Sequence, residues 1–296
     1  MTGFFKKRKL LVTHNGTFHA DDIFATAALS IMLDGNIKVV RTRDPEIISK
    51  ADFVYDVGGE HNPDKNLFDH HQKGGAGARD NGVPYAAFGL VWKKYGEKIC
   101  GSKIVADQLD KRLVQPIDAN DNGINLFTVE GEIAPYIIQD LFFLFRPSWK
   151  EVQDFDTAFN EVVKIAIVII NREIKKMSDN LEAENFVTDA YNKSTNKQII
   201  VIDGPYPWHE VLGNHPEPIY AVFPKIDTWR VECVRKEKYS FENRKPLPAE
   251  WAGLRDEKLA EITGVKDATF CHNGRFMAVS KSKEGALELA NKALLA

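Results

Sequence analysis

Carboxylate and imidazole side chains cluster in the first half of the chain, directly after short apolar runs. The residues of these clusters are His14, His19, Asp21 and Asp22 in THNGTFHADD, Asp56 in YDVGG, Asp69, His70 and His71 in FDHHQKG, and Asp118 and Asp121 in DANDNG. Carboxylates and imidazoles without thiolates suit Mn²⁺, Mg²⁺, Fe or Zn²⁺, which they bind through oxygen and nitrogen. Several carboxylates buried together without a cation would repel one another strongly. The clusters therefore predict a site for divalent metal ions.

Each cluster also has a purely structural interpretation when it is taken alone. Asp21 and Asp22 could cap the start of a helix, and Asp56 before two glycines could belong to an ordinary turn. The two histidines of FDHHQKG could be polar loop residues, and DANDNG is rich in turn formers. These interpretations do not explain why four such clusters occur at four predicted element ends. The coincidence favours the metal site.

The strands and helices that must position these clusters are predicted to form an α/β domain. Apolar patterning predicts strands at Lys9–Thr13, Ile37–Arg41 and Phe53–Val57, and helices at Ile23–Leu33, Tyr85–Tyr95 and Lys103–Val114. Strands that alternate with helices and right-handed crossovers form a parallel sheet covered on both faces. Ligands bind such sheets beyond the carboxyl ends of the strands, so clusters about 100 residues apart can share one site.

In the second half of the chain the apolar pattern becomes helical and then returns to that of strands. Residues 126–195 predict a helical connector with helices at Ala134–Phe145 and Asp154–Met177, and we interpret the aromatic run LFFLFRPSW within it as core or interdomain packing rather than a base-stacking surface. Strand patterns return in QIIVID, PIYAVFPK and TWRVECV, followed by a helix at Lys283–Leu295. We expect a metal-binding α/β domain at 1–125 and a smaller, substrate-binding α+β domain at 196–296.

Composition excludes several classes of protein. The 296 residues are 44% hydrophobic and 27% charged, which is ordinary for a globular chain and excludes disordered, collagen-like and coiled-coil proteins. A net charge of −3 excludes a protein that grips nucleic acid over its whole surface. Any phosphate-binding surface must therefore be local.

Cysteine usage and hydropathy predict the compartment. The three cysteines form no CxxC pair, which argues against a disulfide framework or a thiolate zinc site. No run approaches the roughly 18 apolar residues of a membrane span, and the apolar stretch after the basic MTGFFKKRKL is too short for a signal peptide. We expect a cytoplasmic protein, whose oligomeric state the sequence leaves open.

The motifs resemble a known family. The order of the His-rich first loop, a lone Asp, Asp-His-His and a later Asp resembles the DHH phosphoesterase superfamily. Within it, THNGTFHADD, YDVGG, FDHHQKG, DANDNG and RKPLPAEWAGLRDEKL resemble the Myg exonuclease family of metal-dependent hydrolases. The resemblance runs from about Thr13 to Leu294, nearly the whole chain.

This resemblance implies a DHH-like fold for the first domain and a centre of two divalent ions, Mn²⁺ or else Mg²⁺, which together activate a water and clamp a phosphate. The implied metal ligands are His14, His19, Asp21, Asp56 as a bridge, His70 and Asp118. Asp69 would orient a histidine, and His71 would contact the substrate phosphate or protonate the leaving oxygen.

The first motif departs from the superfamily pattern. The pattern reads His, three residues, then Asp-x-Asp, whereas here four residues separate His14 from His19-Ala20-Asp21. His19 in place of the first Asp removes one negative charge from the site. This leaves Asp22 either as a helix cap or as an alternative ligand, and the role of Asp121 also stays open.

In the second domain the resemblance implies groups that hold the substrate. The substrate-binding candidates are Arg244, Lys245, Arg255, His272 and Arg275. Packing or a solvated face is the alternative for each. Related sequences tend to carry Gly-Gly after the HNGRF-like turn, where this chain has Met277-Ala278-Val279, so a close approach of that backbone to substrate is in doubt.

The expected function is that of a hydrolase, a metal-dependent phosphodiesterase similar to 3′→5′ RNA exonucleases that acts on short single-stranded RNA or oligonucleotides. Long polymers would need many basic contacts that this chain lacks. One alternative is a phosphohydrolase for pyrophosphate or a small nucleotide. The other is a metal-stabilised binding protein without turnover.

Overall fold

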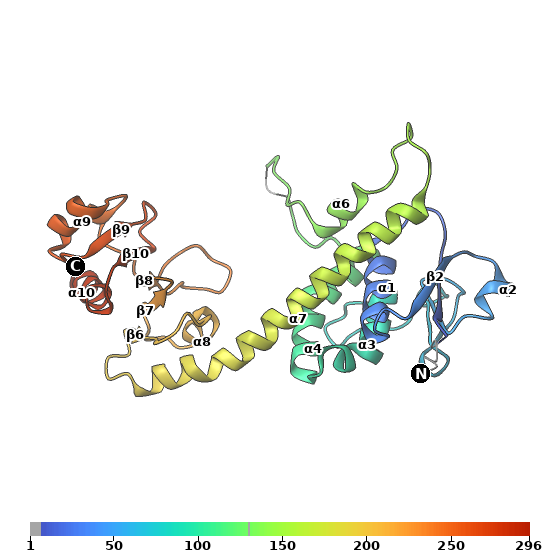
Figure 1. The fold of residues 1–296 in the computed structure, drawn as a ribbon, viewed down its shortest axis with the longest axis horizontal. Coiled ribbons are helices and arrows are strands. Elements are labelled where there is room, and N and C mark those ends of the chain that lie inside the picture. The colour runs from blue at the N-terminus through green and yellow to red at the C-terminus, as the bar shows by residue number, and fades with distance from the viewer. Residues whose placement is uncertain (1–6, 130) are drawn as a thin grey trace, which may run out of the picture. The chain divides into compact units, whose positions relative to one another are not determined.

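A computed structural model describes residues 7–129 and 131–296, which form two compact units, each with its own β-sheet (Figure 1). The first unit ends at Met177 and the second begins at Ser178, so the boundary falls inside the long helix α7 (Phe155–Lys193). The α/β class, with a mostly parallel first sheet, a long connecting helix and a smaller second unit, is confirmed. The division at residues 125 and 195 stays a prediction.

The first sheet has the strand order β2-β1-β3-β5-β4. Its strands are β1 (Lys9–Thr13), β2 (Ile37–Arg41), β3 (Phe53–Tyr55), β4 (His61–Asn62) and β5 (Leu67–Phe68). The pairs β1–β2, β1–β3 and β3–β5 are parallel, and only β4 runs antiparallel to its neighbour β5. The carboxyl ends of β1, β3 and β5 therefore lie along one edge.

Helices pack around this sheet. They are α1 (Ala20–Met32), α2 (Pro45–Ile48), α3 (Ala87–Cys100), α4 (Lys103–Leu109), α5 (Gln115–Asp121) and α6 (Ile138–Phe143), with the 3₁₀ turn η1 (Pro63–Lys65) and the π-helical turn η2 (Asp110–Val114). Nearly all of α1 is buried, and Phe24 in it stacks on Phe88 of α3 with ring centroids 5.3 Å apart. The helix predicted at Lys103–Val114 corresponds to α4 and η2.

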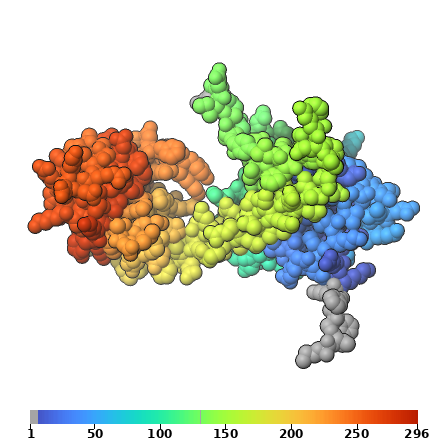
Figure 2. All heavy atoms as spheres, turned by 45° about the horizontal axis from the view of Figure 1, so that its top comes forward, coloured from blue at the N-terminus to red at the C-terminus, as the bar shows by residue number. Residues whose placement is uncertain are grey.

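The segment between α5 and α7 is less helical than the sequence predicts. The helix expected at Ala134–Phe145 is confined to α6, because Pro135 has no N–H to donate and disfavours helical geometry in the residue before it. Phe142 anchors α6 through its buried ring, whose centroid lies 5.3 Å from that of Phe24. The chain on either side of α6 projects from the unit, as the green and yellow-green lobes in Figure 2 show.

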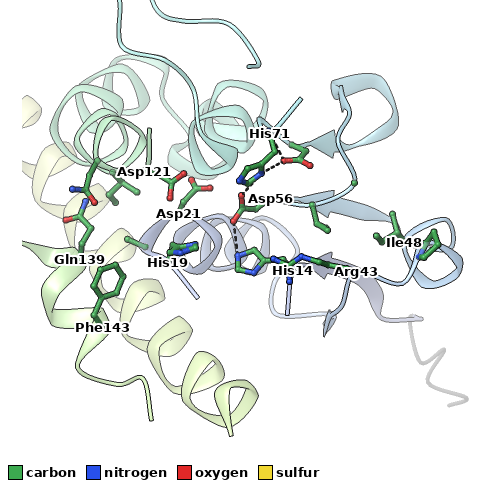
Figure 3. A pocket seen from close by; sticks show the side chains of 17 residues that line it. His14, His19, Asp21, Arg43, Ile48, Asp56, His71, Asp121, Gln139 and Phe143 are labelled. Atoms are coloured by element: carbon green, nitrogen blue, oxygen red, sulfur yellow. Dashed lines mark hydrogen bonds and ion pairs between the residues drawn. The ribbon is translucent and has the colours of Figure 1, made fainter. Parts of the chain in front are cut away.

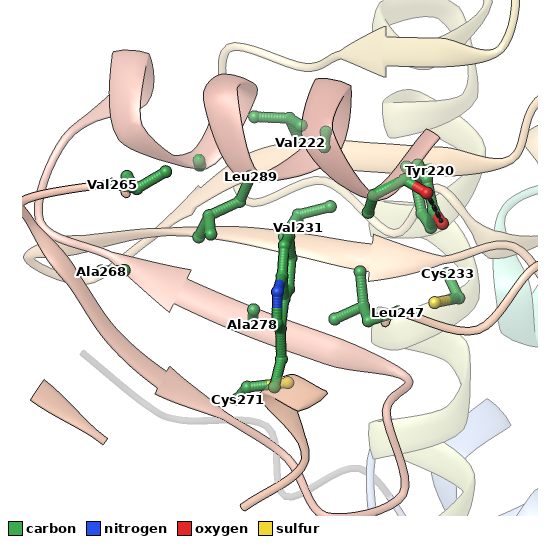
Figure 4. Close-up of a cluster of buried hydrophobic side chains, with 14 of the residues drawn as sticks. Tyr220, Val222, Val231, Cys233, Leu247, Val265, Ala268, Cys271, Ala278 and Leu289 are labelled. Carbon is green, nitrogen blue, oxygen red and sulfur yellow. Dashed lines mark hydrogen bonds between the residues drawn. The ribbon is translucent and has the colours of Figure 1, made fainter. Parts of the chain in front are cut away.

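The second unit has the strand order β6-β7-β8-β10-β9, with only β6–β7 parallel. Its strands are β6 (Ile199–Val201), β7 (Tyr220–Lys225), β8 (Thr228–Cys233), β9 (Ala268–Cys271) and β10 (Met277–Ser280). Its helices are α8 (His209–Gly213), η3 (Ala249–Trp251), α9 (Asp256–Thr263) and α10 (Lys283–Leu295). Leu289 of α10 packs with Val222 and Val231 of the sheet in one buried cluster (Figure 4). Trp208, Leu212 and Val187 belong to a second cluster.

Candidate metal centre

Three strand ends and two helices bring the acidic and imidazole residues together. His14 follows β1, Asp56 follows β3, and the Asp69-His70-His71 triplet follows β5. Asp21 lies in the first turn of α1, and Asp121 is the last residue of α5. Because β1, β3 and β5 are parallel, these side chains converge at one edge of the sheet.

Asp56 lies at the middle of the cluster (Figure 3). Its Oδ2 is 3.1 Å from His14 Nε2, and its Oδ1 is 3.2 Å from His70 Nε2. Burial raises the pKa of the Asp56 carboxyl, but the imidazoles of His14 and His70 outweigh burial and hold it well below its usual range. Asp56 also adopts a left-handed φ of 56°, a conformation that Asp tolerates better than most residues and that recurs at functional sites.

Two buried polar atoms beside Asp56 lack hydrogen bonds among the described residues. They are Nε2 of His14 and Oδ2 of Asp22, which lie 3.3 Å apart. His14 Nδ1 is 3.1 Å from the carbonyl oxygen of Asn15, where it can only donate. Donation to a backbone carbonyl is how metal-bound histidines are usually oriented, and it leaves Nε2 facing the carboxylates. The donor set and these two atoms without hydrogen bonds therefore fit a divalent cation.

The ligand atoms fall into overlapping groups that share Asp56 or His70. The first group is His14, His19 and Asp56, the second is Asp56, His70 and His71, and the third is Asp21, His70 and Asp121. His70 Nε2 is 3.3 Å from Asp121 Oδ2 as well as 3.2 Å from Asp56 Oδ1. Two neighbouring groups joined in this way have the composition of a two-ion site.

Burial and neighbouring negative charges disfavour the ionised form of the carboxyls around Asp56. Burial raises the pKa of Asp22 to about 7, and burial together with the Asp56 charge raises that of Asp121 to about 6. The pKa of Asp21 also lies well above its ordinary value, because the group is buried near Asp121. Asp21 is fixed by the amides of Phe88 and Ala87 at the start of α3, which donate to its oxygens at 2.6 and 3.0 Å. A cation would relieve the repulsion within this cluster.

Asp69 and His71 form an adjacent pair. Asp69 accepts hydrogen bonds from the backbone amides of Gly59, His70 and His71, and its Oδ1 is 2.8 Å from His71 Nδ1. The carboxylate raises the pKa of His71, whose side chain is 61% exposed. Asp69 therefore orients an imidazole that is open to the cavity.

Asp118 lies outside these groups. Its Oδ2 accepts from Arg79 at 2.8 Å, and its Oδ1 accepts from the Gly89 amide at 3.0 Å. Arg79 also binds Asp110 through two nitrogens, at 2.7 and 3.0 Å. Among the described residues, Asp118 thus ties α5 to α3, and Asp121 presents the carboxylate of α5 to the cluster. The same motif contains both, but Asp118 is the ligand expected from the sequence, and Arg79 is not expected there at all.

The cluster opens into a cavity of about 750 Å³. On one side its wall includes Arg43 and Ile48, and on the other it includes Gln139 and Phe143 of α6 (Figure 3). Pro45 also lines the cavity. None of these five residues is expected from the sequence as part of the site. Only the fold places them beside Asp56.

The residues expected to hold substrate lie in the second unit, where several of their polar groups contact that unit itself. Arg244 donates to the carbonyls of His215 and Pro218, at 2.6 and 2.8 Å, and to that of Gly213. Lys245 donates to the Leu294 carbonyl at 2.7 Å. Their role in substrate binding stays a prediction.

The other three candidates surround the β9–β10 turn. Arg255 lies over the ring of Phe270, 4.7 Å from its centroid. His272 Nδ1 accepts from the Gly274 amide at 2.9 Å, and Arg275 has a left-handed φ of 57°. Substrate binding by these residues also stays a prediction.

Comparison with known proteins gives the family. The model of the MYG1 exonuclease family, described as an uncharacterised protein family (UPF0160), matches residues 10–294. The chain belongs to this family. MYG1 exonuclease of Homo sapiens is 31% identical over 323 residues, which cover 95% of this chain and 85% of that protein. The MYG1 protein of Schizosaccharomyces pombe is 30% identical over 315 residues, with coverage of 96% and 97%.

A more distant match within solved structures is RecJ in complex with Mn²⁺ from Thermus thermophilus. It has a TM-score of 0.30 and 10% identity, a similarity too low to assign a fold. The match covers 98% of the MYG1-family chain and 52% of RecJ, so the chain spans about half the RecJ length. Among the described residues, no helix is both long and apolar enough to span a membrane.

Proposed function

We propose that this MYG1-family chain is a metal-dependent phosphodiesterase, a hydrolase that removes nucleotides from short single-stranded RNA in the 3′→5′ direction. The observation that carries the proposal is the buried Asp56, which belongs to two groups of ligands and lies beside two buried atoms that have no hydrogen bonds among the described residues. The names of the mammalian relatives, MYG1 exonuclease, support a nuclease activity.

The ligand sets follow from the groups of atoms. His14, His19 and Asp56 would hold one divalent ion, and Asp22 would add its Oδ2, which has no hydrogen bond among the described residues. Asp21, His70 and Asp121 would hold the second, with Asp56 shared. We propose Mn²⁺, with Mg²⁺ as the alternative, because the donors are nitrogen and oxygen only. When bound, two such ions supply a nucleophile at neutral pH and neutralise charge on the phosphate.

The remaining residues would position the substrate and move a proton. His71, whose Nδ1 is held by Asp69, would give a proton from Nε2 to the leaving oxygen. The Asp69 carboxylate raises the pKa of His71, which favours the protonated, donating form of the imidazole. We propose Asp118 as a residue that positions Asp121, since its carboxylate is already paired with Arg79.

The test compares the wild type, Asp56→Asn and the control Asp64→Asn, which makes the same change on an exposed residue of η1. Each protein is analysed for bound metal and incubated in Mn²⁺ with 5′-labelled RNAs of two to twelve nucleotides. We expect near two metal equivalents and a ladder of shortened products from the wild type and the control. Asp56→Asn should lose its bound metal, and its rate of hydrolysis should fall about a thousandfold, which corresponds to several kcal/mol of activation free energy.

Other outcomes would support the two alternatives. Hydrolysis confined to pyrophosphate, mononucleotides or dinucleotides would replace the exonuclease with a small-nucleotide phosphohydrolase. Metal binding that raises the melting temperature without any hydrolysis would indicate a binding protein. Hydrolysis that survives Asp56→Asn unchanged would place the chemistry elsewhere.

A further inference from the structure

The cavity continues past the ligand groups to a wall that the proposed chemistry does not use. This wall is lined by Ile117 and Asn120 of α5 and by Gln139 and Phe143 of α6. In Figure 3 Gln139 and Phe143 lie on the side of His19 and Asp121 that faces away from His14. A ligand bound at the carboxylates could therefore extend toward α6.

Gln139 has an unused hydrogen-bond donor in this wall. Its side chain lines the cavity although the residue is only 4% exposed, and Nε2 has no partner among the described residues. A buried amide without a partner is unfavourable and rare in folded proteins. Because Nε2 itself is inaccessible to solvent, an acceptor in the cavity can pair with this donor only when the amide turns toward the cavity that the side chain lines.

Phe143 provides an aromatic surface one helical turn after Gln139. It lines the same cavity and is 37% exposed, whereas its neighbour Phe142 is fully buried. The Arg146 guanidinium lies over the Phe143 ring, 3.7 Å from its centroid, and also donates to the carbonyl of Phe18. Arg146 covers part of the ring, and the exposed part of Phe143 contributes to the cavity wall.

We propose that Gln139 and Phe143 form a nucleobase-binding subsite. A base would stack on Phe143, and the Gln139 amide would turn toward the cavity to donate an N–H to an acceptor on the edge of the base, such as a purine N7 or a carbonyl oxygen. The proposal rests on the proposed function in placing the attached phosphate at the metal ligands. It also departs from the interpretation of LFFLFRPSW as packing alone, since Phe142 is buried but Phe143 lines the cavity.

This subsite bears on the substrate class. Pyrophosphate has no base and would leave the α6 wall uncontacted, whereas a nucleotide would contact both parts of the cavity. Stacking tolerates any base, and a single amide donor finds an acceptor on each of the four. The subsite therefore favours nucleotides over other phosphates without reading a sequence.

Binding of two small probes tests the subsite without turnover. Affinities of AMP and ribose 5-phosphate, which differ by the base, are measured by calorimetry in Mn²⁺ for the wild type, Phe143→Leu and Gln139→Leu. The control is Leu144→Ala, a change at a 71% exposed neighbour that does not line the cavity. We expect the wild type to bind AMP about tenfold more tightly than ribose 5-phosphate. Phe143→Leu should remove most of that preference, Gln139→Leu should reduce it, and the control should keep it.

Several results would overturn the subsite. They are equal affinities of the wild type for the two probes, undetectable AMP binding, or equal weakening of both probes by Phe143→Leu. The same RNA length series separates this proposal from the proposed function. AMP preference without RNA hydrolysis would refute the exonuclease and keep the subsite, whereas RNA hydrolysis without AMP preference would do the reverse.

Discussion

Asp69 contributes to the site by holding the imidazole of His71 in position. Asp69 is 2% exposed and is fixed by three backbone amides, so its carboxylate cannot turn away from His71. His71 is thereby held with one nitrogen on Asp69 and the other toward the cavity. The pair should affect the rate and its pH dependence rather than the amount of bound metal.

The variant Asp69→Asn should lower kcat roughly 10–100-fold, as the loss of an orienting partner typically does. It should also lower the pKa of His71, because the Asp69 carboxylate is the main cause of its elevation. As the pH rises, activity that needs protonated His71 should then be lost at a lower pH than in the wild type. The measurement is kcat against pH, with Asp64→Asn as the control. An unshifted profile would contradict a role for His71 as the proton donor.

At the scale of elements, the contact between α3 and α5 depends on the absence of a side chain at Gly89. A Cβ there would lie 1.8 Å from Asp118 Oδ2 and 2.9 Å from Arg79 Nη2. Asp118 is fully buried and bound to both Arg79 and the Gly89 amide. Any side chain at this position must displace a buried ion pair.

Gly89→Ala should therefore lower the free energy of unfolding by about 2–4 kcal/mol, despite the better helix propensity of Ala. Urea unfolding followed by circular dichroism measures the change. Gly213→Ala in α8 is the matched control, since a Cβ there meets no atom within 4 Å. Equal stability of the two variants would show that the α3–α5 contact yields more easily than its geometry indicates.

The sequence predicts those helices and strands whose own residues show a helical or alternating apolar pattern. The bounds of β2 (Ile37–Arg41) and α10 (Lys283–Leu295) match the prediction, because alternation and helical periodicity are properties of the segment itself. The two-residue strands β4 and β5 carry no such pattern, and neither they nor β9 and β10 were predicted. Their pairing depends on distant segments, which a local pattern does not reveal.

The same limit applies to the site. Strand ends indicated where His14, Asp56 and His70 would converge, since a parallel sheet fixes that edge. The choice between Asp118 and Asp121 depends on the rotation of α5, and Arg79, some 40 residues earlier, binds one of them. Gln139 and Phe143 reach the cavity only through the packing of α6, which the sequence pattern does not specify.

At the scale of the whole molecule, the charge state of the centre should couple metal binding to stability. The centre joins segments from His14 to Asp121, and burial raises the pKa of Asp22 to about 7 and that of Asp121 to about 6. In the unfolded chain such carboxyls titrate near 4. Between about pH 4 and 7 the metal-free folded state thus binds more protons than the unfolded state, so these groups make it less stable as the pH rises.

Bound metal should remove this decrease in stability at higher pH, because a cation stabilises the ionised carboxylates. We expect the increase in melting temperature on adding Mn²⁺ to be larger at pH 7.5 than at pH 5. Thermal unfolding at both pH values, with and without Mn²⁺, measures it, and Asp56→Asn should show little increase at either. An equal increase at the two pH values would contradict the coupling.

Arg146 has a consequence for how the two parts of the cavity communicate. It contacts Phe143 on α6 and the carbonyl of Phe18, the residue before His19. If a cation bound at His19 stabilises the contacts of Arg146 with Phe143 and Phe18, then binding of the metal and binding of the base are coupled. This coupling free energy is the same in both directions by thermodynamic necessity. A nucleotide base would then strengthen the binding of metal by the same factor by which metal strengthens the binding of the base.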